Sequence, residues 1–545
     1  MKVYKMKKSV ILTAAALGFF RSKDAEKQLV IFEEMMLLEE FATVSRETIN
    51  GFLEAEIIRR HVVYQNRQQK AFDKIESDAA KPLTGGVTSA IGHIEKMPAG
   101  KYVLTVAQNN TEVNRVFFGA LKNFCNDMGA QLLIAKMTYN KNGFQSDQAA
   151  TDGVYYAKEV LPYLVEGQID LGGKIHFCAQ ANVLPTAKNP LTGFESITGV
   201  GVGVVIPASK IALKCTAALK GGKNKVLFAT GAVTLRNYIM RKAGAVAATE
   251  HSIGALYVEV SETGDYIARQ LELIEGSDGF YDNGSYFTAD TITTDQSPLA
   301  LQFGDIHAEK MESCNLAKMN KLIDYFKPHN IICHDVMDFS SRNHHNIKDC
   351  AFMFAQEVNR NTVKQDIITT VKVIDSLARG YNTIHIIESN HDLAINTWLK
   401  NTDFKEDPVN AVLYLQCMHA LYSHIEETKN SHFNMLQYVY DNVAEGQTSR
   451  IYFHDSNESV VMAGVEMGCH GHHGSNGSRG SPSQFRALGI MLNTGHTHTP
   501  SILGGCYTAG VTGSLYMGYN ENGASSWALA NILTWPNGQR QVIFM

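Results

Sequence analysis

The 545-residue sequence has no long hydrophobic run and no regular cysteine pattern. No stretch approaches the roughly 18 consecutive apolar residues of a membrane span. The nine cysteines are odd in number and include no C-x-x-C pair, which argues against a disulfide framework. Internal repeats and low-complexity tracts are missing too. With 45% hydrophobic and 19% charged residues, the composition is that of a globular protein, and the length predicts about two to four domains.

The N-terminal stretch MKVYKMKKSVILTAAALGFF combines a basic start with an apolar run, as secretory signals do. The run leads directly into a charged pattern that is typical of a helix. The cysteines give no sign of an oxidising compartment. We therefore expect a cytoplasmic protein with reduced thiols and no membrane partner.

The net charge is −5 at pH 7, so overall charge gives no argument for nucleic-acid binding. A local exception lies between Ser196 and Thr249, where no acidic residue occurs. Eight basic residues lie in this stretch: Lys210, Lys214, Lys220, Lys223, Lys225, Arg236, Arg241 and Lys242. Such an excess can bind phosphates. A solvated lysine-rich face explains it equally well.

Residues 1–80 are predicted to be helical, because apolar and charged residues interleave at helical spacing. Within them, LLEEFATVSRETINGFL resembles a helix-turn-helix, with Ser45 as a candidate N-cap of the second helix. Thr43 stands where the glycine of such a turn is usual. An amphipathic arm that packs or forms a homo-oligomer is the alternative.

Three further regions follow along the chain. Residues 81–100 are polar and contain glycine and proline, which predicts a linker. Residues 101–295 begin with a strand, a helix and a strand and continue with strands and glycine turns, which predicts an accessory α/β domain. Residues 296–545 form a second region of strands and helices. The predicted fold class is therefore α/β, in the sense of α+β.

Sixteen of the twenty histidines lie between residues 307 and 498, many of them directly after an apolar, strand-like run. Five such runs end in the motifs GDIH, CHDVMD, ESNHD, GCHGHHG and TGHTH. Loops at the carboxyl ends of strands converge in α/β sheets, so these side chains are expected to meet. Imidazole, carboxylate and amide ligands together suit a borderline-hard cation such as Mn²⁺, Fe or Zn²⁺.

These motifs, in this order, resemble those of the calcineurin-like metallophosphoesterase superfamily over residues 296–545. The resemblance implies a two-sheet β-sandwich flanked by helices, with the site at the strand rim. It implies one metal ion on Asp305, His307, Asp335 and His498. It implies a second ion on Asp335, Asn390, His470 and His496. His391 would protonate the leaving oxygen, and Asp392 would orient the His391 ring.

The same resemblance implies two divalent ions as cofactors, Mn²⁺ first, with Fe, Zn and Mg as alternatives. Such a pair neutralises a phosphoester and makes a bound water acidic. The sequence departs from the superfamily at two positions, since His334 and Ser389 stand where glycine is usual. Both precede a ligand position and no ligand is lost, so we expect an active enzyme.

Candidates for contacting the substrate phosphate lie in the segments DFSSRNHHN and GCHGHHGSNGSRGS. They are Arg342, Asn343, His344 and Arg479. Backbone amides of a glycine-rich loop, together with an arginine fork, suit phosphate oxygens. The alternatives are that Arg342 pairs with an acid, and that His472 and His473 are ordinary loop residues.

The segments AQNNTEVN, NPLTGFESITG, HDVMDFSSRNHH, DPVNAVLYL and NGSRGS resemble a phage-encoded branch of this superfamily. A further resemblance is to the pre-early nucleases of T5-like phages that degrade host DNA. It implies a Mn-dependent DNase that acts on double-stranded DNA in the host bacterial cytoplasm. Two alternatives stay open: a phosphatase or nucleotide phosphodiesterase with a small substrate, and a DNA-binding scaffold with a vestigial metal site.

Overall fold

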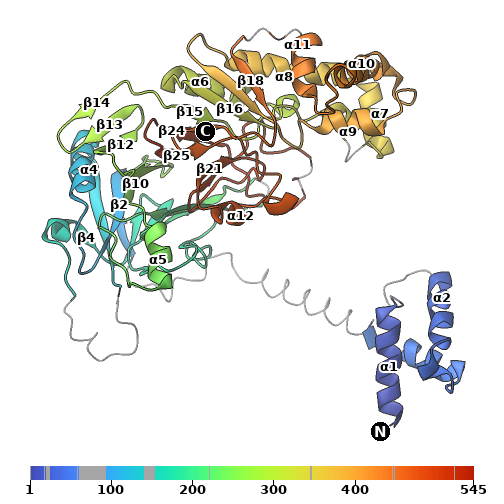
Figure 1. The fold of residues 1–545 in the computed structure, drawn as a ribbon. Coiled ribbons are helices and arrows are strands. Elements are labelled where there is room, and N and C mark those ends of the chain that lie inside the picture. Colours follow the sequence, from blue (N-terminus) through green and yellow to red (C-terminus); the bar gives the residue numbers. More distant parts are fainter. Residues whose placement is uncertain are drawn as a thin grey trace. The chain divides into compact units, whose positions relative to one another are not determined.

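The computed structural model describes residues 2–17, 19, 25–57, 59–60, 94–139, 154–219, 221–343, 347–444, 446, 449–518, 520 and 522–545 (Figure 1). The chain divides into two compact units, Met1–Gly86 and Val87–Met545. No described helix combines the length and the apolar character that crossing a membrane requires.

The described part of the first unit, which ends at residue 60, is helical, as predicted, and residues 61–80 of that prediction lie outside the described residues. It contains α1 (Lys2–Ala16), α2 (Ala25–Met36), the 3-10 helix η2 (Glu39–Phe41) and a further helix at 46–57 and 59–60. Ser45 caps that last helix, because its Oγ accepts a hydrogen bond from Thr48 N at 3.2 Å. The LLEEF part of the helix-turn-helix segment is a turn and a 3-10 helix, not the end of an α-helix. The unit has its own buried apolar core of Val10, Ala14, Phe19, Met35, Phe41, Ile49 and Leu53.

The second unit opens with the predicted strand, helix and strand. These are β2 (Gly100–Gln108), α4 (Arg115–Met128) and β3 (Gln131–Met137). Asn114 caps α4 by accepting from Phe117 N at 3.0 Å, and Gly129 ends it with a φ of 61°. The sheet has the order β11-β10-β2-β3-β4, completed by β4 (Leu164–Val165), β10 (Gly254–Val260) and β11 (Tyr266–Glu272). Its outer face is covered by α4 and by a three-stranded sheet of β12 (Gly279–Asp282), β13 (Ser285–Thr288) and β14 (Ile292–Thr293).

An eleven-stranded sheet crosses the predicted domain boundary at 295/296. Its order is β1-β5-β6-β7-β9-β8-β22-β23-β21-β20-β19. The first part comprises β1 (Ile94–Met97), β5 (Gln168–Leu171), β6 (Ile175–Cys178), β7 (Gly203–Ile206), β8 (Ile211–Thr216) and β9 (Lys225–Thr230). The second part comprises β19 (Val461–Met462), β20 (Val465–Glu466), β21 (Met491–Thr494), β22 (Ser501–Leu503) and β23 (Cys506–Thr508).

The two parts of this sheet join through β8 and β22, which pair antiparallel with Ile502 opposite Leu213. The predicted accessory and metallophosphoesterase regions therefore share one sheet inside one compact unit. The predicted linker at 81–100 lies outside the described residues up to residue 93. Its last part is strand, because β1 pairs parallel with β5.

A six-stranded sheet of order β18-β17-β16-β15-β24-β25 forms the rest of the unit. Its strands are β15 (Ala300–Gln302), β16 (Asn330–His334), β17 (Thr383–Ile387), β18 (Ile451–His454), β24 (Ala530–Thr534) and β25 (Arg540–Phe544). The helices of this region are α6 (Ser313–Phe326), α7 (Cys350–Val358), α8 (Val363–Leu377), α9 (Ala394–Asn401), α10 (Ala411–Thr428) and α11 (Met435–Asn442). Two short helices elsewhere are α5 (Lys242–Thr249) and α12 (Pro482–Arg486).

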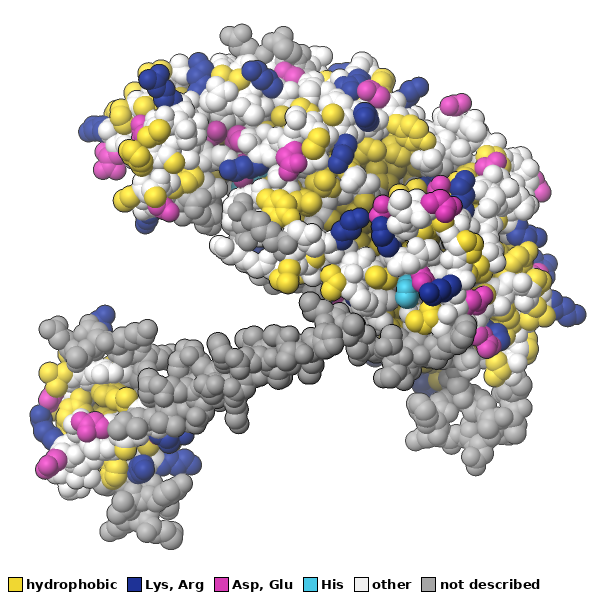
Figure 2. Space-filling model, turned by 180° about the vertical axis from the view of Figure 1, so that it is seen from behind, with side chains coloured by type: hydrophobic (Ala, Val, Ile, Leu, Met, Phe, Trp, Pro, Cys, Tyr) yellow, Lys and Arg dark blue, Asp and Glu magenta, His cyan; other side chains and the backbone are white. Residues whose placement is uncertain are grey.

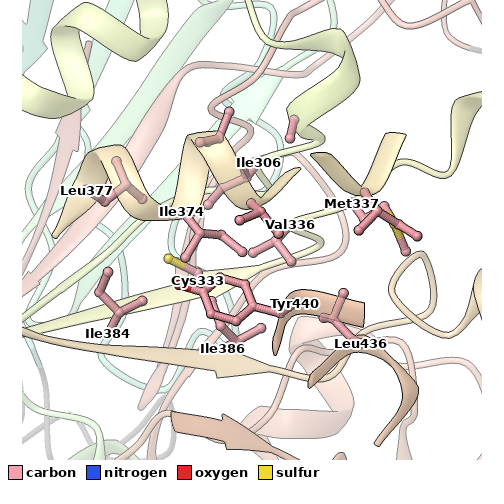
Figure 3. Close-up of a cluster of buried hydrophobic side chains, with 14 of the residues drawn as sticks. Ile306, Cys333, Val336, Met337, Ile374, Leu377, Ile384, Ile386, Leu436 and Tyr440 are labelled. Carbon is pink, nitrogen blue, oxygen red and sulfur yellow. The ribbon is translucent and has the colours of Figure 1, made fainter. Parts of the chain in front are cut away.

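The six-stranded sheet is buried on both faces. On one face, Cys333 and Ile386 pack against Ile374 of α8 and Tyr440 of α11 (Figure 3). On the other face, Ile332 and other side chains pack against Val465 of the eleven-stranded sheet. Burial on two faces explains the apolar run Ile331–Cys333 in β16. The mixed α/β fold class is thereby confirmed, and the loops at the strand ends are held between two sheets.

Candidate metal centre

The predicted ligand residues follow strand ends in both sheets. β15, β16 and β17 are parallel neighbours in the six-stranded sheet. β15 leads into Asp305 and His307, β16 into Asp335, and β17 into Asn390 and His391. β20 and β21 are parallel neighbours in the eleven-stranded sheet. β20 leads into His470, and β21 leads into His496 and His498. Parallel strands end at the same edge of a sheet, so their loops converge.

Backbone hydrogen bonds hold these loops together. His307 N donates to Asp335 O at 2.7 Å, which ties the loop after β15 to the loop after β16. Gly495 N donates to His470 O at 2.8 Å and ties the two loops of the other sheet. A Cβ on Gly495 would overlap Asp305 Oδ1, so this glycine permits the loops of the two sheets to approach.

Several of the converging residues have left-handed backbones. The φ angles are 47° at His307, 43° at Asp335, 68° at His496 and 56° at His498. This region is uncommon for residues other than glycine and costs about 1–3 kcal/mol for each such residue. Strain of this kind persists where the surroundings impose it, and it concentrates at functional sites.

One group of side chains matches the first predicted ligand set. Asp305, His307, Asp335 and His498 are all buried, and each offers a ligand atom within 4.8 Å of the others. His498 Nε2 lies 3.0 Å from Asp305 Oδ2 and 3.1 Å from His307 Nε2. Two imidazole nitrogens that face each other beside two carboxylates form a donor set that can hold a metal ion.

Unsatisfied polar atoms support this interpretation. Within the described residues, neither carboxylate oxygen of Asp305 makes a hydrogen bond of good geometry, and both are buried. His498 Nε2 lies 3.0 Å from Oδ2, and Oδ1 has no such neighbour in the described part of the chain; a buried carboxylate with so little compensation fits a bound cation. The donor set and the orphaned oxygens together fit a metal ion.

The second predicted ligand set also converges. Asn390 Oδ1 lies 3.1 Å from His470 Nε2 and 3.1 Å from His496 Nδ1. His470 Nε2 lies 3.4 Å from Asp335 Oδ2. That same oxygen lies 3.7 Å from His307 Nε2 of the first set. Asp335 therefore stands between the two sets, at the position that the sequence assigned to a bridging ligand.

The protonation of these groups follows from burial and from their neighbours. Burial alone would lower the pKa of His307, but the hydrogen bond to Asp338 and the nearby carboxylates raise it to about 9. Burial would raise the pKa of Asp335, but His470 and His391 hold it well below its usual range. Burial, and then the charge of His470, lowers the pKa of His496 to about 4. The Asp335 carboxylate is thus ionised and the His496 ring is neutral, which are the forms that bind a metal ion.

Asp338 is a site residue to which the sequence analysis assigned no role. Its Oδ1 accepts from His307 Nδ1 at 3.1 Å and lies 3.5 Å from His391 Nδ1. The hydrogen bond at Nδ1 leaves His307 Nε2 directed at Asp305 and Asp335, an orientation that ligating histidines use. The CHDVMD motif contained this carboxylate, but only the folded loop shows which rings it contacts.

Asp392 does not orient His391, contrary to the prediction. Its carboxylate accepts from Met337 N at 3.1 Å and from Ser389 Oγ at 2.7 Å. Burial and the charge of Asp335 raise the pKa of Asp392 to about 7. Asp338 occupies the position beside the His391 ring instead. His391 itself lies at the site, with its backbone N 3.3 Å from Asp335 Oδ1.

The departures at His334 and Ser389 have different structural consequences. Ser389 donates to Asp392 and accepts from the Asp392 backbone N at 3.2 Å, so it stabilises the loop after β17. His334 is fully buried, and within the described residues neither ring nitrogen has a hydrogen-bond partner. Its ring lies 5.4 Å from that of His470, and burial lowers its pKa to about 3.

The structure gives one of the four predicted phosphate contacts, Arg342, a different role, and the other three stay predictions. Arg342 is buried and bonds both carboxylate oxygens of Asp407, at 2.9 and 2.8 Å, so its guanidinium is committed to a structural ion pair. Asn343 accepts from Ile347 N through its backbone O. His344 lies outside the described residues. Arg479 is exposed, and its charge is the smallest of the causes that lower the pKa of His496.

The basic stretch at 196–249 is largely paired with acids that lie outside it. Lys210 contacts Glu250 at 2.6 Å, Lys214 pairs with Glu195, and Lys223 lies 3.2 Å from Asp265. Lys225 is buried and donates to two backbone oxygens. The face of the second unit seen in Figure 2 likewise shows basic side chains interspersed with acidic ones. The stretch therefore does not form one uncompensated basic surface.

The described residues thus define an α/β protein with a buried cluster of aspartate and histidine that can hold a metal ion. The chain is 40% identical to Protein A1 of Escherichia phage T5 over 551 aligned residues. The alignment covers 98% of this chain and 97% of the phage protein. The chain therefore belongs to the family of that phage protein, and the expected relationship to a T5-like phage is confirmed. No family model matches the sequence, and no solved structure matches it.

Proposed function

We propose that the protein is a two-metal-dependent phosphodiesterase of the calcineurin-like superfamily, and that it degrades DNA. The observation that carries this proposal is the meeting of two donor sets at one carboxylate. Asp335 Oδ2 lies 3.7 Å from His307 Nε2 of the first set and 3.4 Å from His470 Nε2 of the second set. Five strand ends from two sheets deliver these groups to one place, and a metal ion would compensate their buried carboxylates.

The side chains divide the work of phosphodiester hydrolysis. Metal ions held here would neutralise the phosphate and make a bound water acidic near neutral pH. Asp335 fits the bridging position between the two sets. His391, partly exposed beside the centre and oriented by Asp338, donates the proton that the leaving oxygen needs. Mn²⁺ suits the mixture of imidazole, carboxylate and amide ligands, as do Fe and Zn²⁺.

We infer double-stranded DNA of the host, in the bacterial cytoplasm, as the substrate. The support is the family relationship to a phage T5 protein along nearly the whole chain. A second support is the motif series that resembles metal-dependent nucleases. The large accessory sheets, which share strands with the catalytic part, suit a polymeric substrate better than a small phosphate ester.

The test is degradation of linear double-stranded DNA by the purified full chain with Mn²⁺. Wild type is compared with Asp335→Asn and His391→Ala, and His419→Ala serves as the control because His419 is exposed and lies on α10. The proposal expects cleavage by wild type and control, and losses of at least about 100-fold in the other two variants. Equal cleavage by Asp335→Asn would refute the site.

A small phosphoester is the second candidate substrate, and the paired lysines favour it. Lys210, Lys214 and Lys223 each have an acidic partner, so they supply less charge to a DNA backbone than the sequence suggested. Salt discriminates between the two substrates. DNA binding through several phosphates weakens steeply as salt rises, whereas hydrolysis of a nucleotide does not.

A further inference from the structure

A pocket outside both donor sets is lined by Trp527, whose ring packs against that of His498. It has a volume of about 490 Å³, which is in the range of small-ligand sites. Three segments line it: residues around 218–226, the loop at 515–529 and the C-terminal Phe544 and Met545. The side chains that matter below are Leu219, Lys223, Asn224, Tyr516, Trp527 and Phe544.

Trp527 connects this pocket to the candidate metal centre. Its ring centroid lies 4.1 Å from that of His498, with the planes at 78°. The next residue, Ala528, donates its backbone N to His498 O at 3.3 Å. His498 Nε2 in turn lies 3.0 Å from Asp305 Oδ2. Trp527 therefore lines the pocket and also contacts His498, a member of the first donor set.

The pocket wall is fixed by hydrogen bonds within the protein. Asn224 Nδ2 donates to Trp527 O at 2.6 Å. Ala218 and Ser525 exchange two backbone hydrogen bonds, each of 2.9 Å. The hydroxyls of Thr499 and Ser526 lie 2.7 Å apart and join the loop to the strand end that carries His498. These hydrogen bonds hold residues 525–527 in place on the pocket wall.

The chemistry of the lining selects a flat aromatic group with a nearby negative charge. Tyr516, Trp527 and Phe544 offer aromatic surfaces, on which nucleobases stack with little sequence preference. Lys223 lines the pocket, and its ammonium shares the Asp265 carboxylate with Lys174, so the two lysines have one carboxylate between them. An aliphatic chain would use neither the charge nor the adjacent donor set.

The geometry points to a subsite for an unstacked nucleobase, next to the phosphate that the candidate metal centre would cleave. This inference rests on the proposed function, since it places the base of the substrate strand in the pocket. A base leaves the stack at a cost of a few kcal/mol, and stacking on Trp527 and Tyr516 offsets that cost. The subsite would favour single-stranded ends or locally opened DNA near the cleaved bond.

Binding can be measured without metal and without turnover, by tryptophan fluorescence of the full chain in EDTA. The chain has three tryptophans; Trp398 and Trp535 are buried, with 3% and 0% exposure, and Trp527 is partly exposed. Thymidine 5′-monophosphate and a short single-stranded oligonucleotide should each quench the emission saturably. Ribose 5-phosphate, which lacks a base, should neither quench nor compete. Absence of saturable quenching, or equal competition by ribose 5-phosphate, would overturn the inference.

Two variants locate the binding without touching His498. Tyr516→Ala removes one stacking surface, and Leu219→Glu brings an anion to the rim. Each should weaken nucleotide binding by about tenfold or more. Leu184→Glu is the matched control, because Leu184 is 52% exposed and does not line the pocket. Circular dichroism checks that all three variants fold. Unchanged binding in both pocket variants would overturn the inference.

Kinetics then separate this subsite from the proposed function. With Mn²⁺, both pocket variants should raise KM for the p-nitrophenyl ester of thymidine 5′-monophosphate. They should leave hydrolysis of methyl p-nitrophenyl phosphate unchanged. If wild type cleaves DNA but shows no base-dependent binding, the subsite is refuted and the proposed function stands. If base-dependent binding occurs without any cleavage, the pocket stands and the proposed function is refuted.

Discussion

Replacing Arg342 with alanine tests whether this arginine holds the fold or the substrate. Its side chain is 1% exposed, and its guanidinium bonds Asp407 through Nε at 2.9 Å and Nη2 at 2.8 Å. Removing one partner of a buried ion pair costs about 3–5 kcal/mol, because the other charge stays buried. Asp407 keeps donors from Asn410 at 2.9 Å and Trp398 at 3.3 Å. We therefore expect Arg342→Ala to lower the free energy of unfolding by about 3 kcal/mol, the lower end of that range.

The assay is urea unfolding followed by circular dichroism, with Arg479→Ala as the control. Arg479 is exposed, so its removal should change the free energy of unfolding by less than about 0.5 kcal/mol. The double variant Arg342→Met with Asp407→Leu should recover most of the loss, since no charge is left unpaired. The reasoning is refuted if Arg342→Ala unfolds like wild type while KM for DNA rises tenfold.

Three further predictions concern the metal centre. Gly495→Ala should abolish metal binding, because its Cβ would overlap Asp305 Oδ1. Gly380→Ala is the control and should bind normally, because Gly380 has open space around it. Calorimetric titration with Mn²⁺ compares the two variants. Asp338→Asn should lower kcat about 10- to 100-fold in a DNA cleavage assay; an unchanged rate would exclude its orienting role. Because the pKa of His307 is raised to about 9, a metal ion must displace its proton below that pH. Apparent Mn²⁺ affinity should therefore rise between about pH 6 and pH 8.5, and a flat profile would contradict this.

Much of the candidate site could be predicted, because it depends on local patterns. Each ligand residue follows a short apolar run, and the structure ends a strand just before each of them. The first ligand set of Asp305, His307, Asp335 and His498 is the buried group that the structure brings together. Sheet geometry explains why these strand ends meet, and the superfamily resemblance supplied the division of the residues into two ligand sets.

The errors concern contacts between residues far apart in the chain. Arg342 meets Asp407, and the lysines of the basic stretch meet acids that flank it, and neither pairing has a local signature. Asp338 reaches His307 and His391 because the loop turns through left-handed backbones at Asp335 and Phe339. The shared eleven-stranded sheet was missed for the same reason, since β8 and β22 pair across the predicted boundary.

The stoichiometry of Mn²⁺ binding tests the central claim most directly. Equilibrium dialysis of the metal-stripped full chain would count bound ions in wild type and in Asp335→Asn, with Asp290→Asn as the control because Asp290 is exposed. The account predicts two ions per chain in wild type and control, and loss of at least one in Asp335→Asn, since Asp335 faces both donor sets. Equal binding by Asp335→Asn and wild type, or no binding by either, would contradict it.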